Sequence, residues 1–429
     1  MFIALFDNVN SIKGKDMFEN GIYQWRKSVG KQVSVAVSGD ICPWKSAEPM
    51  ILEGKSAEIL KGIQPALDKA DLRIAQWETV ITDKLNPIVK AGPNLSVKPG
   101  VEAFLTAGKF DVALLANNHT GDHGPSEEIS TINYLHAAGI KTVGAGFCEE
   151  DARKPLHLEK NGYAFSILNF CETEFGTSWE DHAGTNAMDE FANLLQIEEE
   201  SKKYDIVIVI IHGGNEHNPI PSPRMKKLYR AFAKAGATMV MNIHTHCPQG
   251  IEVIDNVPII YSPGNFFFSD MGELDLSNFW WSGYLPRVSF DAEGAYAVEI
   301  TPFYFAPDPW RIVALEGGQR QWFLDYVDKI SALMKTDGDH WFDVWCASRF
   351  TMPLGWVYTS PAEALAKDPN DADGLKRFPG LRHMLTCQAH NELSRRCFLL
   401  IERGKIDALK AEIPALTELR TARFAEQKI

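Results

Sequence analysis

Short apolar runs rich in β-branched residues alternate with helical segments between about residues 32 and 301, and this alternation limits what the chain can fold into. Continuous apolar runs are typical of strands buried on both faces, and helices between them are typical of crossovers. The sequence therefore predicts an α/β protein. The predicted strands are residues 33–38, 72–76, 111–116, 164–169, 206–211 and 238–243, and the predicted helices are residues 56–70, 126–138, 189–203 and 223–235.

The pattern changes after about residue 307, where apolar residues recur at helical spacing. Residues 319–335 and 391–410 are predicted to form amphipathic helices. We therefore expect an N-terminal extension (1–31), one large domain (32–307) and a mostly helical C-terminal region (308–429). Its aromatic residues predict a packing surface against the large domain, and homo-oligomer formation through this region is a further expectation.

Composition excludes several classes of protein. The formal net charge of −13 argues against a nucleic-acid partner. Seven cysteines without a CxxC pair argue against both a disulfide framework and a cysteine zinc cage. The first apolar run stops at Asp7, and no later run approaches the roughly 20 residues of a membrane helix. We therefore expect a cytoplasmic protein without a membrane anchor.

Potential metal ligands follow nearly every predicted strand. In open α/β sheets ligands gather beyond the carboxyl ends of the strands. A mixed set of carboxylates, amides and imidazoles suits Zn, Mn or Fe. The sequence therefore predicts a divalent metal site of one or two ions. The candidate residues are Asp40, Glu78, Asn117, Asn118, His119, His212, His244 and His246.

Each candidate also has a structural interpretation. Asp40 could cap a turn, Glu78 could be a surface charge, and adjacent asparagines often occupy left-handed turns. A lone histidine is more often structural than a ligand. His244 and His246 differ, because residues two apart in an extended segment point to the same side and can reach one ion.

The order of these motifs resembles the poly-γ-glutamate capsule synthesis (CapA) family across roughly residues 32–270. The resemblance implies a metallo-dependent phosphatase-like fold, a four-layer sandwich of two mixed β-sheets flanked by helices, with a metal centre at one sheet edge. The motifs that carry it are SGD (38–40), WET (77–79), LLANNHTGDHG (114–124), IIHGGNE (210–216), NIHTHCPQGIE (242–252) and PIIYSPGNFFF (258–268).

The resemblance also implies roles for single residues. His119 would be the catalytic acid or base, joined by Glu216, while Asn117 and Asn265 would lie on the substrate side. Cys42 occupies the position of a histidine in calcineurin-like phosphatases and is interpreted as a buried thiol. The implied metal ligands are Asp40, Glu78, Asn118, His212, His244 and His246, with Glu78 able to bridge two ions.

Three functions remain open on the sequence. The leading one is a metal-dependent hydrolase or transferase acting on a peptide-like amide of polyglutamate type or on a phosphoester. The second is a peptide epimerase, which would remove and return an α-proton of a ribosomal peptide. The third is a non-catalytic, metal-binding subunit of a polymer synthase, and the presence of His119 beside the ligand set argues against it.

Overall fold

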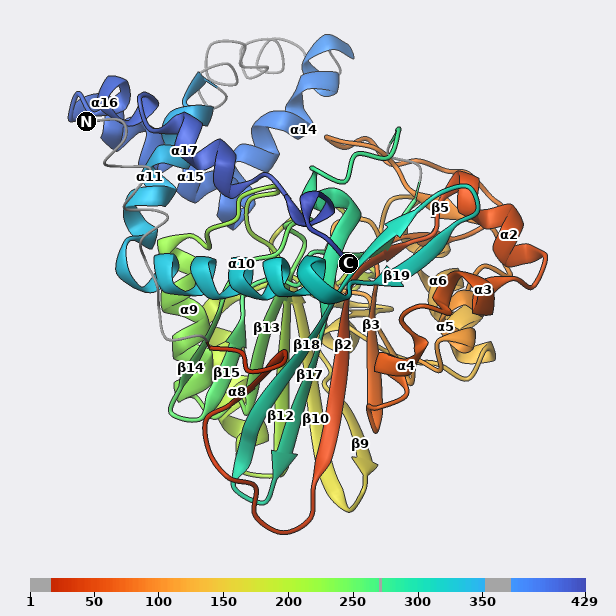
Figure 1. Cartoon of the computed structure of the whole chain (residues 1–429). Helices are drawn as coiled ribbons and strands as arrows, with labels where there is room; N and C mark the ends of the chain where they lie inside the picture. The colour runs from red at the N-terminus through yellow and green to blue at the C-terminus, as the bar shows by residue number, and fades with distance from the viewer. Residues whose placement is uncertain (1–16, 270–271, 352–371) are drawn as a thin grey trace.

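Two mixed β-sheets packed face to face, with helices on their outer faces, form the centre of the molecule (Figure 1). The computed structural model describes residues 17–269, 272–351 and 372–429. Within these ranges no helix is long and apolar enough to cross a bilayer.

The first sheet has nine strands, in the order β1-β18-β17-β2-β3-β6-β7, with β16 paired to β2 and β19 paired to β18. Strands β2, β3, β6 and β7 run parallel, so their carboxyl ends share one edge. The strands are β1 (Ile22–Gln24), β2 (Val33–Cys42), β3 (Leu72–Trp77), β6 (Val112–Leu114), β7 (Lys141–Val143), β16 (Asn265–Phe268), β17 (Ser282–Asp291), β18 (Gly294–Ala306) and β19 (Arg311–Ala314).

The second sheet has six strands, of which β10, β12, β13 and β15 are parallel. Its two outer strands arrive through tight hairpins at Asn161-Gly162 and Asp255-Asn256, where all four residues have positive φ, as residues of these types readily do. The order is β14 (Ile251–Ile254), β15 (Val257–Ile260), β13 (Met239–Ile243), β12 (Ile206–His212), β10 (Tyr163–Cys171) and β9 (Leu156–Lys160). Two further pairs are β4 (Val80–Ile81) with β5 (Ser96–Val97), and β8 (Ala145–Gly146) with β11 (Gly184–Thr185).

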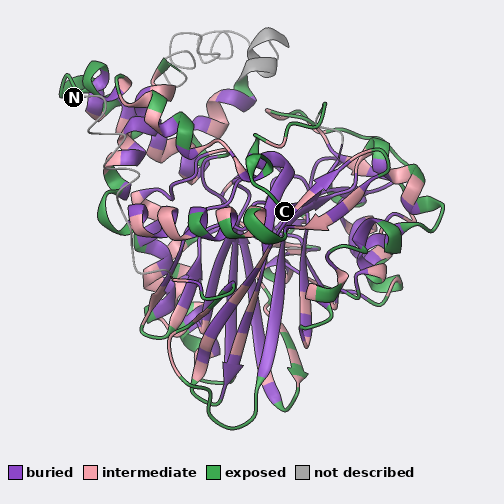
Figure 2. Ribbon diagram, viewed as in Figure 1, coloured by how far each residue is buried: buried purple, intermediate pink, exposed green. Residues whose placement is uncertain are grey.

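Strand β12 shows why the predicted strands are apolar throughout. Its residues 206, 208 and 210 face the core between the two sheets, whereas 207, 209 and 211 face the helices outside. Both faces are buried (Figure 2). The expected four-layer sandwich is therefore confirmed. The helices of the sandwich are α2 (Glu48–Leu52), α3 (Ser56–Leu60), α4 (Gln64–Leu67), α5 (Ala103–Ala107), α6 (Pro125–Ala137), α7 (Glu149–Ala152), α8 (Glu190–Ser201) and α9 (Pro223–Lys234).

Two predicted helices are broken. Residues 56–70 form α3 and α4 because Gly62 lies against the backbone of Ile312, where a Cβ would come within 2.3 Å of the carbonyl oxygen, and because Pro65 starts a new turn. Residues 391–410 fall into α15 (Gln388–Glu402) and α16 (Ile406–Lys410), since Gly404 adopts a left-handed conformation with φ +62°.

The C-terminal region is helical, as predicted, and shares the core of the sandwich. Phe323 and Val327 of α10 belong to the cluster between the sheets, and the Ser331 hydroxyl accepts a 2.8 Å hydrogen bond from the Ile251 amide. The first sheet also extends beyond the predicted domain, since β1 and β19 both pair with β18. The remaining helices are α10 (Gly317–Thr336), α11 (Gly338–Arg349), α14 (Ala372–Thr386), α15, α16 and α17 (Ile413–Leu419).

A buried carboxylate fastens α15 to the sandwich. Glu172, one residue after β10, forms an ion pair with Arg224 of α9 and accepts hydrogen bonds from the amides of Ala389 (2.8 Å) and Gly214 (3.2 Å). Ala389 lies in the first turn of α15, where an anion is stabilised by the free amides and the helix dipole. The C-terminal helices are thus held at the edge where the parallel strands end (Figure 1).

Candidate metal centre

Both sheets deliver polar side chains to the same edge. Asp40 lies near the end of β2, Glu78 follows β3, His212 ends β12, and His244 follows β13. The residue before Asp40 must be glycine because the backbone of Gly264 lies against it. A Cβ on Gly39 would lie 1.8 Å from the carbonyl oxygen of Gly264. The sequence prediction that strand-end residues converge therefore holds in the structure.

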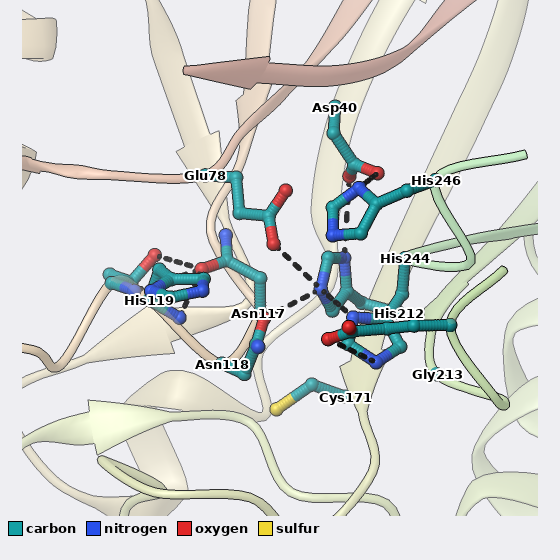
Figure 3. Close-up of polar contacts among 12 residues, drawn as sticks. Asp40, Glu78, Asn117, Asn118, His119, Cys171, His212, Gly213, His244 and His246 are labelled. Carbon is teal, nitrogen blue, oxygen red and sulfur yellow. Dashed lines mark hydrogen bonds and ion pairs between the residues drawn. The ribbon is translucent and has the colours of Figure 1, made fainter. Parts of the chain in front are cut away.

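Short contacts join these side chains into one cluster (Figure 3). His212 Nε2 lies 2.9 Å from Asn118 Oδ1, 3.0 Å from His244 Nδ1 and 3.5 Å from Glu78 Oε1. Asp40 approaches from the other side, with carboxylate oxygens 3.7 Å from His212 Nδ1 and 3.3 Å from His246 Nδ1. All six predicted ligands thus belong to one cluster.

The cluster has the electrostatics of a cation site. Both carboxylate oxygens of Asp40 and of Glu78 are buried without a hydrogen bond, as is His212 Nδ1. Burial and the neighbouring charge of Asp40 raise the pKa of Glu78 well above its usual range, and burial lowers the pKa of His212 to about 3. Buried carboxylates without partners are costly, and a divalent ion would compensate them. The residues present therefore fit a metal.

Two sets of three ligand atoms lie within 4.8 Å of one another: Glu78 with His244 and His246, and Asp40 with Glu78 and His212. Glu78 belongs to both sets. This arrangement is able to hold either one ion or two ions that share Glu78.

The backbone at the histidine pair differs from the sequence prediction. His244 and His246 have φ values of +102° and +53°, so the segment is a left-handed turn and not an extended strand. Their ring centroids still lie 5.8 Å apart. The left-handed turn thus brings the two imidazoles together, and non-glycine residues in such a conformation cluster at functional sites.

His119 lies beside the cluster in a separate hydrogen-bonded group. Its Nδ1 is 2.7 Å from Asp122 Oδ2, and Lys90 forms an ion pair with the same carboxylate. Burial raises the pKa of Asp122, but His119 and Lys90 outweigh that effect and lower it. Burial and the charge of Lys90 lower the pKa of His119. A neutral imidazole that donates its Nδ1 proton to Asp122 would leave Nε2 free to act as a base.

Two residues predicted to lie on the substrate side have side chains that are hydrogen-bonded within the protein. Asn117 Oδ1 accepts from the amides of His119 (3.0 Å) and Thr120 (2.8 Å), and its Nδ2 donates to the Trp77 carbonyl (2.8 Å). Asn265 Oδ1 lies 2.7 Å from His246 Nδ1, and its Nδ2 donates to the Trp280 carbonyl. Both side chains are fully buried. Asn117 shapes the loop of His119, and Asn265 orients His246.

A cavity of about 320 Å³ opens beside the cluster, between the sandwich and helices α11, α14 and α15. Glu216 lines it with a half-exposed side chain, and its Oε1 lies 4.0 Å from His244 Nε2. Glu216 thus shares the cavity with His119, and its catalytic role stays a prediction. Cys42 is buried outside the groups of ligand atoms, as expected for a structural thiol. Other residues lining the cavity are Lys90, Asn118, His119, Glu174, Phe175, His217, His244, Trp345, Arg349, His383 and His390.

Asp122 as the partner of His119 was not predicted from the sequence, and neither were the cavity residues Arg349, His383 and His390 of the C-terminal helices. The signal for Asp122 was its position three residues after His119 in a loop rich in turn residues. For the C-terminal residues the signal was the spacing His383-x3-Cys387-x2-His390.

Comparisons with known proteins agree with the motif order. The model of the family described as bacterial capsule synthesis protein PGA_cap matches residues 34–270. The PGA biosynthesis protein CapA of Bacillus subtilis (strain 168) is 28% identical over 242 residues, which is 55% of this chain and 63% of that protein. The capsule biosynthesis protein CapA of Bacillus anthracis is 28% identical over 249 residues, 56% of this chain and 60% of that protein. The chain thus spans less than two thirds of the length of these relatives.

Among solved structures, the calcineurin-like phosphoesterase YfkN from Bacillus subtilis is 12% identical with a TM-score of 0.34, covering 66% of this chain and 88% of that one. The 5'-nucleotidase from Candida albicans SC5314 is also 12% identical, with a TM-score of 0.38 over 63% of this chain and 49% of that one. The family model spans more than half of the chain and includes every strand-end ligand, and the chain belongs to the bacterial capsule synthesis protein (PGA_cap) family.

Proposed function

We propose that this protein is a metal-dependent hydrolase acting on a peptide-like amide that carries carboxylates, of the glutamyl type. The observation that carries the proposal is the juxtaposition of two elements: a buried cluster of unpartnered carboxylates and imidazoles, and the His119–Asp122 pair beside it. Both reach one cavity through His244, Asn118 and His119.

The proposed ligands are Asp40, Glu78, Asn118, His212, His244 and His246, with Glu78 shared if two ions bind. Their oxygen and nitrogen donors suit Mn, Zn or Fe. When bound, the metal would polarise the scissile carbonyl and lower the pKa of water.

The protein's own residues supply the proton transfer. His119 Nε2 accepts a proton from the attacking water and returns it to the leaving nitrogen, while Asp122 holds Nδ1 and stabilises the imidazolium. Lys90 fixes that carboxylate and donates a 2.8 Å hydrogen bond to the Asn118 carbonyl, so it links the base to the ligand loop. A purely non-catalytic subunit would not need a base positioned in this way.

A protein with a net charge of −13 repels an acidic substrate, so binding such a substrate requires a positively charged side chain in the cavity. Arg349 lines the cavity, and its guanidinium lies 4.8 Å from the centroid of the Trp345 ring. Its described contact is thus with an aromatic ring and not with a carboxylate. We assign Arg349 to binding a substrate carboxylate.

Replacing Arg349 by glutamine is therefore expected to raise KM about tenfold or more with little change in kcat, because the lost contact serves ground state and transition state alike. Steady-state kinetics on a γ-linked glutamate oligomer would measure this. Arg403→Gln, which changes a charge outside the residues lining the cavity, is the control. A fall in kcat at unchanged KM would contradict the assignment.

The reaction class is tested with the metal-loaded full chain in two labelled solvents. With the γ-linked glutamate oligomer in H₂¹⁸O, a hydrolase releases a free amine and places one ¹⁸O in the new carboxylate. Mass spectrometry after incubation in D₂O would detect the epimerase alternative, which places deuterium at an α-carbon without cleavage. Transfer of the acyl group to an added amine would indicate a transferase. Cleavage of bis-p-nitrophenyl phosphate, but not of the oligomer, would overturn the amide assignment.

A further inference from the structure

A second group of potential ligands lies outside the candidate metal centre, where the C-terminal helices meet the sandwich. It consists of Glu174, His383, Cys387 and His390, whose ligand atoms all lie within 4.8 Å of one another. Glu174 follows β10, His383 lies on α14, Cys387 precedes α15, and His390 lies in its first turn. The group therefore combines a loop of the sandwich with both arms of one helical hairpin.

The contacts within this group are short and largely buried. His383 Nε2 lies 2.5 Å from Glu174 Oε2, and the His383 and His390 ring centroids are 4.2 Å apart. Glu174 and Cys387 are 5% and 1% exposed. His390 Nδ1 is buried without a hydrogen-bond partner among the described residues. An unpaired buried imidazole nitrogen beside a thiol and a carboxylate indicates a missing partner.

Ordinary hydrogen bonding accounts for only part of this arrangement. His383 Nε2 lies close to Glu174 but has no hydrogen-bond partner of suitable geometry among the described residues. The Cys387 thiol contacts Glu172 Oε2 (3.4 Å) and the Glu174 carboxylate. Glu172 is already engaged with Arg224 and with the Ala389 amide. His383 Nε2 and His390 Nδ1 are therefore buried imidazole nitrogens without a hydrogen-bond partner among the described residues, and both belong to the group that contains Glu174 and Cys387.

We infer that Glu174, His383, Cys387 and His390 bind a zinc ion that fastens the α14–α15 hairpin to the sandwich. One sulfur, two nitrogen and one carboxylate oxygen donors match the four ligands of a closed structural zinc site. The cluster of Asp40, Glu78, Asn118 and three imidazoles, by contrast, contains no thiol. The two sites are therefore chemically distinct.

The proposed zinc site lies in the wall of the cavity. Glu174, His383 and His390 line the same cavity as His119 and Glu216. The ion would hold α14 and α15 as one wall of that cavity, with Glu172 adding a second attachment at Ala389. Loss of the ion would release the wall without removing a residue of the His119 group.

Cobalt substitution of the full chain tests the inference. Titration of the metal-free wild-type protein with Co²⁺ is expected to produce an intense near-ultraviolet thiolate-to-cobalt charge-transfer band. Zn²⁺ should abolish the band by displacement. Because the band needs a coordinated sulfur, the thiol-free cluster of Asp40 and Glu78 does not produce it. The band is also independent of any hydrolytic activity.

Three variants complete the test. Cys387→Ser should lose the band, and so should His390→Gln, which keeps the thiol and guards against misfolding of the first variant. Cys397→Ser is the matched control, since this buried thiol of α15 lies outside the four-residue group, contacts Cys346 instead (3.4 Å to its carbonyl), and should leave the band intact. His244→Ala should keep it as well. No band in wild type at saturating Co²⁺, or a band that survives in Cys387→Ser, would overturn the inference.

Discussion

Replacing His119 by alanine is expected to lower turnover by about 100-fold or more, the usual contribution of a positioned acid or base, while the metal content stays unchanged. The reason is that His119 contacts Asp122 and Lys90, whereas the unpartnered carboxylates belong to Asp40 and Glu78. Turnover of the glutamate oligomer and elemental analysis of the same preparation would measure both quantities.

Two further variants serve as comparisons for His119→Ala, one at a proposed metal ligand and one at a surface histidine. His244→Ala is expected to lose metal and activity together, because His244 lies 3.0 Å from His212 and within reach of Glu78. His136→Ala removes a histidine whose Nε2 contacts only the Thr142 hydroxyl at the surface, and it should change neither quantity. If His119→Ala loses metal as His244→Ala does, His119 is a ligand and the proposed proton transfer is wrong.

Removing residues 308–429 is expected to leave a chain that aggregates instead of a smaller stable domain. The deletion takes away β19 and α10, and with them Phe323, Val327 and Ile330 of the core between the sheets. The exposed face would be a large contiguous apolar patch, which soluble monomers rarely tolerate. Size-exclusion chromatography and light scattering of the truncated chain would show this.

A point substitution tests the same packing of the C-terminal region with a smaller change. Phe323→Ala should lower the free energy of unfolding by about 3–5 kcal/mol, the usual cost of emptying a fully buried aromatic site. Leu385→Ala, at a side chain that is 63% exposed, should change it by less than about 0.5 kcal/mol. Urea denaturation would measure both variants. A truncated chain that stays monomeric and as stable as the full chain would show that the C-terminal region is independent.

Much of the sandwich was predictable from sequence because its determinants are local. A strand buried on both faces must be apolar at consecutive positions, as in β12, and a hairpin needs residues that accept positive φ, as at Asn161-Gly162. The convergence of Asp40, Glu78 and His212 followed from one further rule, that parallel strands end at a common edge. None of these steps requires knowledge of a distant contact.

Other features were decided by tertiary contacts. Gly62 interrupts a predicted helix because the backbone of Ile312 lies against it. His244 and His246 converge through a left-handed turn, although the prediction assumed an extended segment. Asn117 and Asn265 resemble substrate contacts in sequence, yet their hydrogen bonds are directed into the protein. A side chain's direction depends on partners that neighbouring residues do not specify.

The sequence by itself thus determined the α/β class, the strand-end ligands and the helical nature of the C-terminal region, because each is encoded in periodicity or in the residues after a strand. Only the tertiary structure placed Asp122 on His119 and brought Glu174 to Cys387 and His390. For Asp122 the reason is the path of the loop, because the direction of a side chain three residues away is set by the contacts of that loop with Lys90. For Glu174 the reason is separation along the chain: α15 meets the loop after β10 through Glu172 and its hydrogen bond from Ala389, a contact between residues 217 positions apart. No local pattern encodes such a pairing.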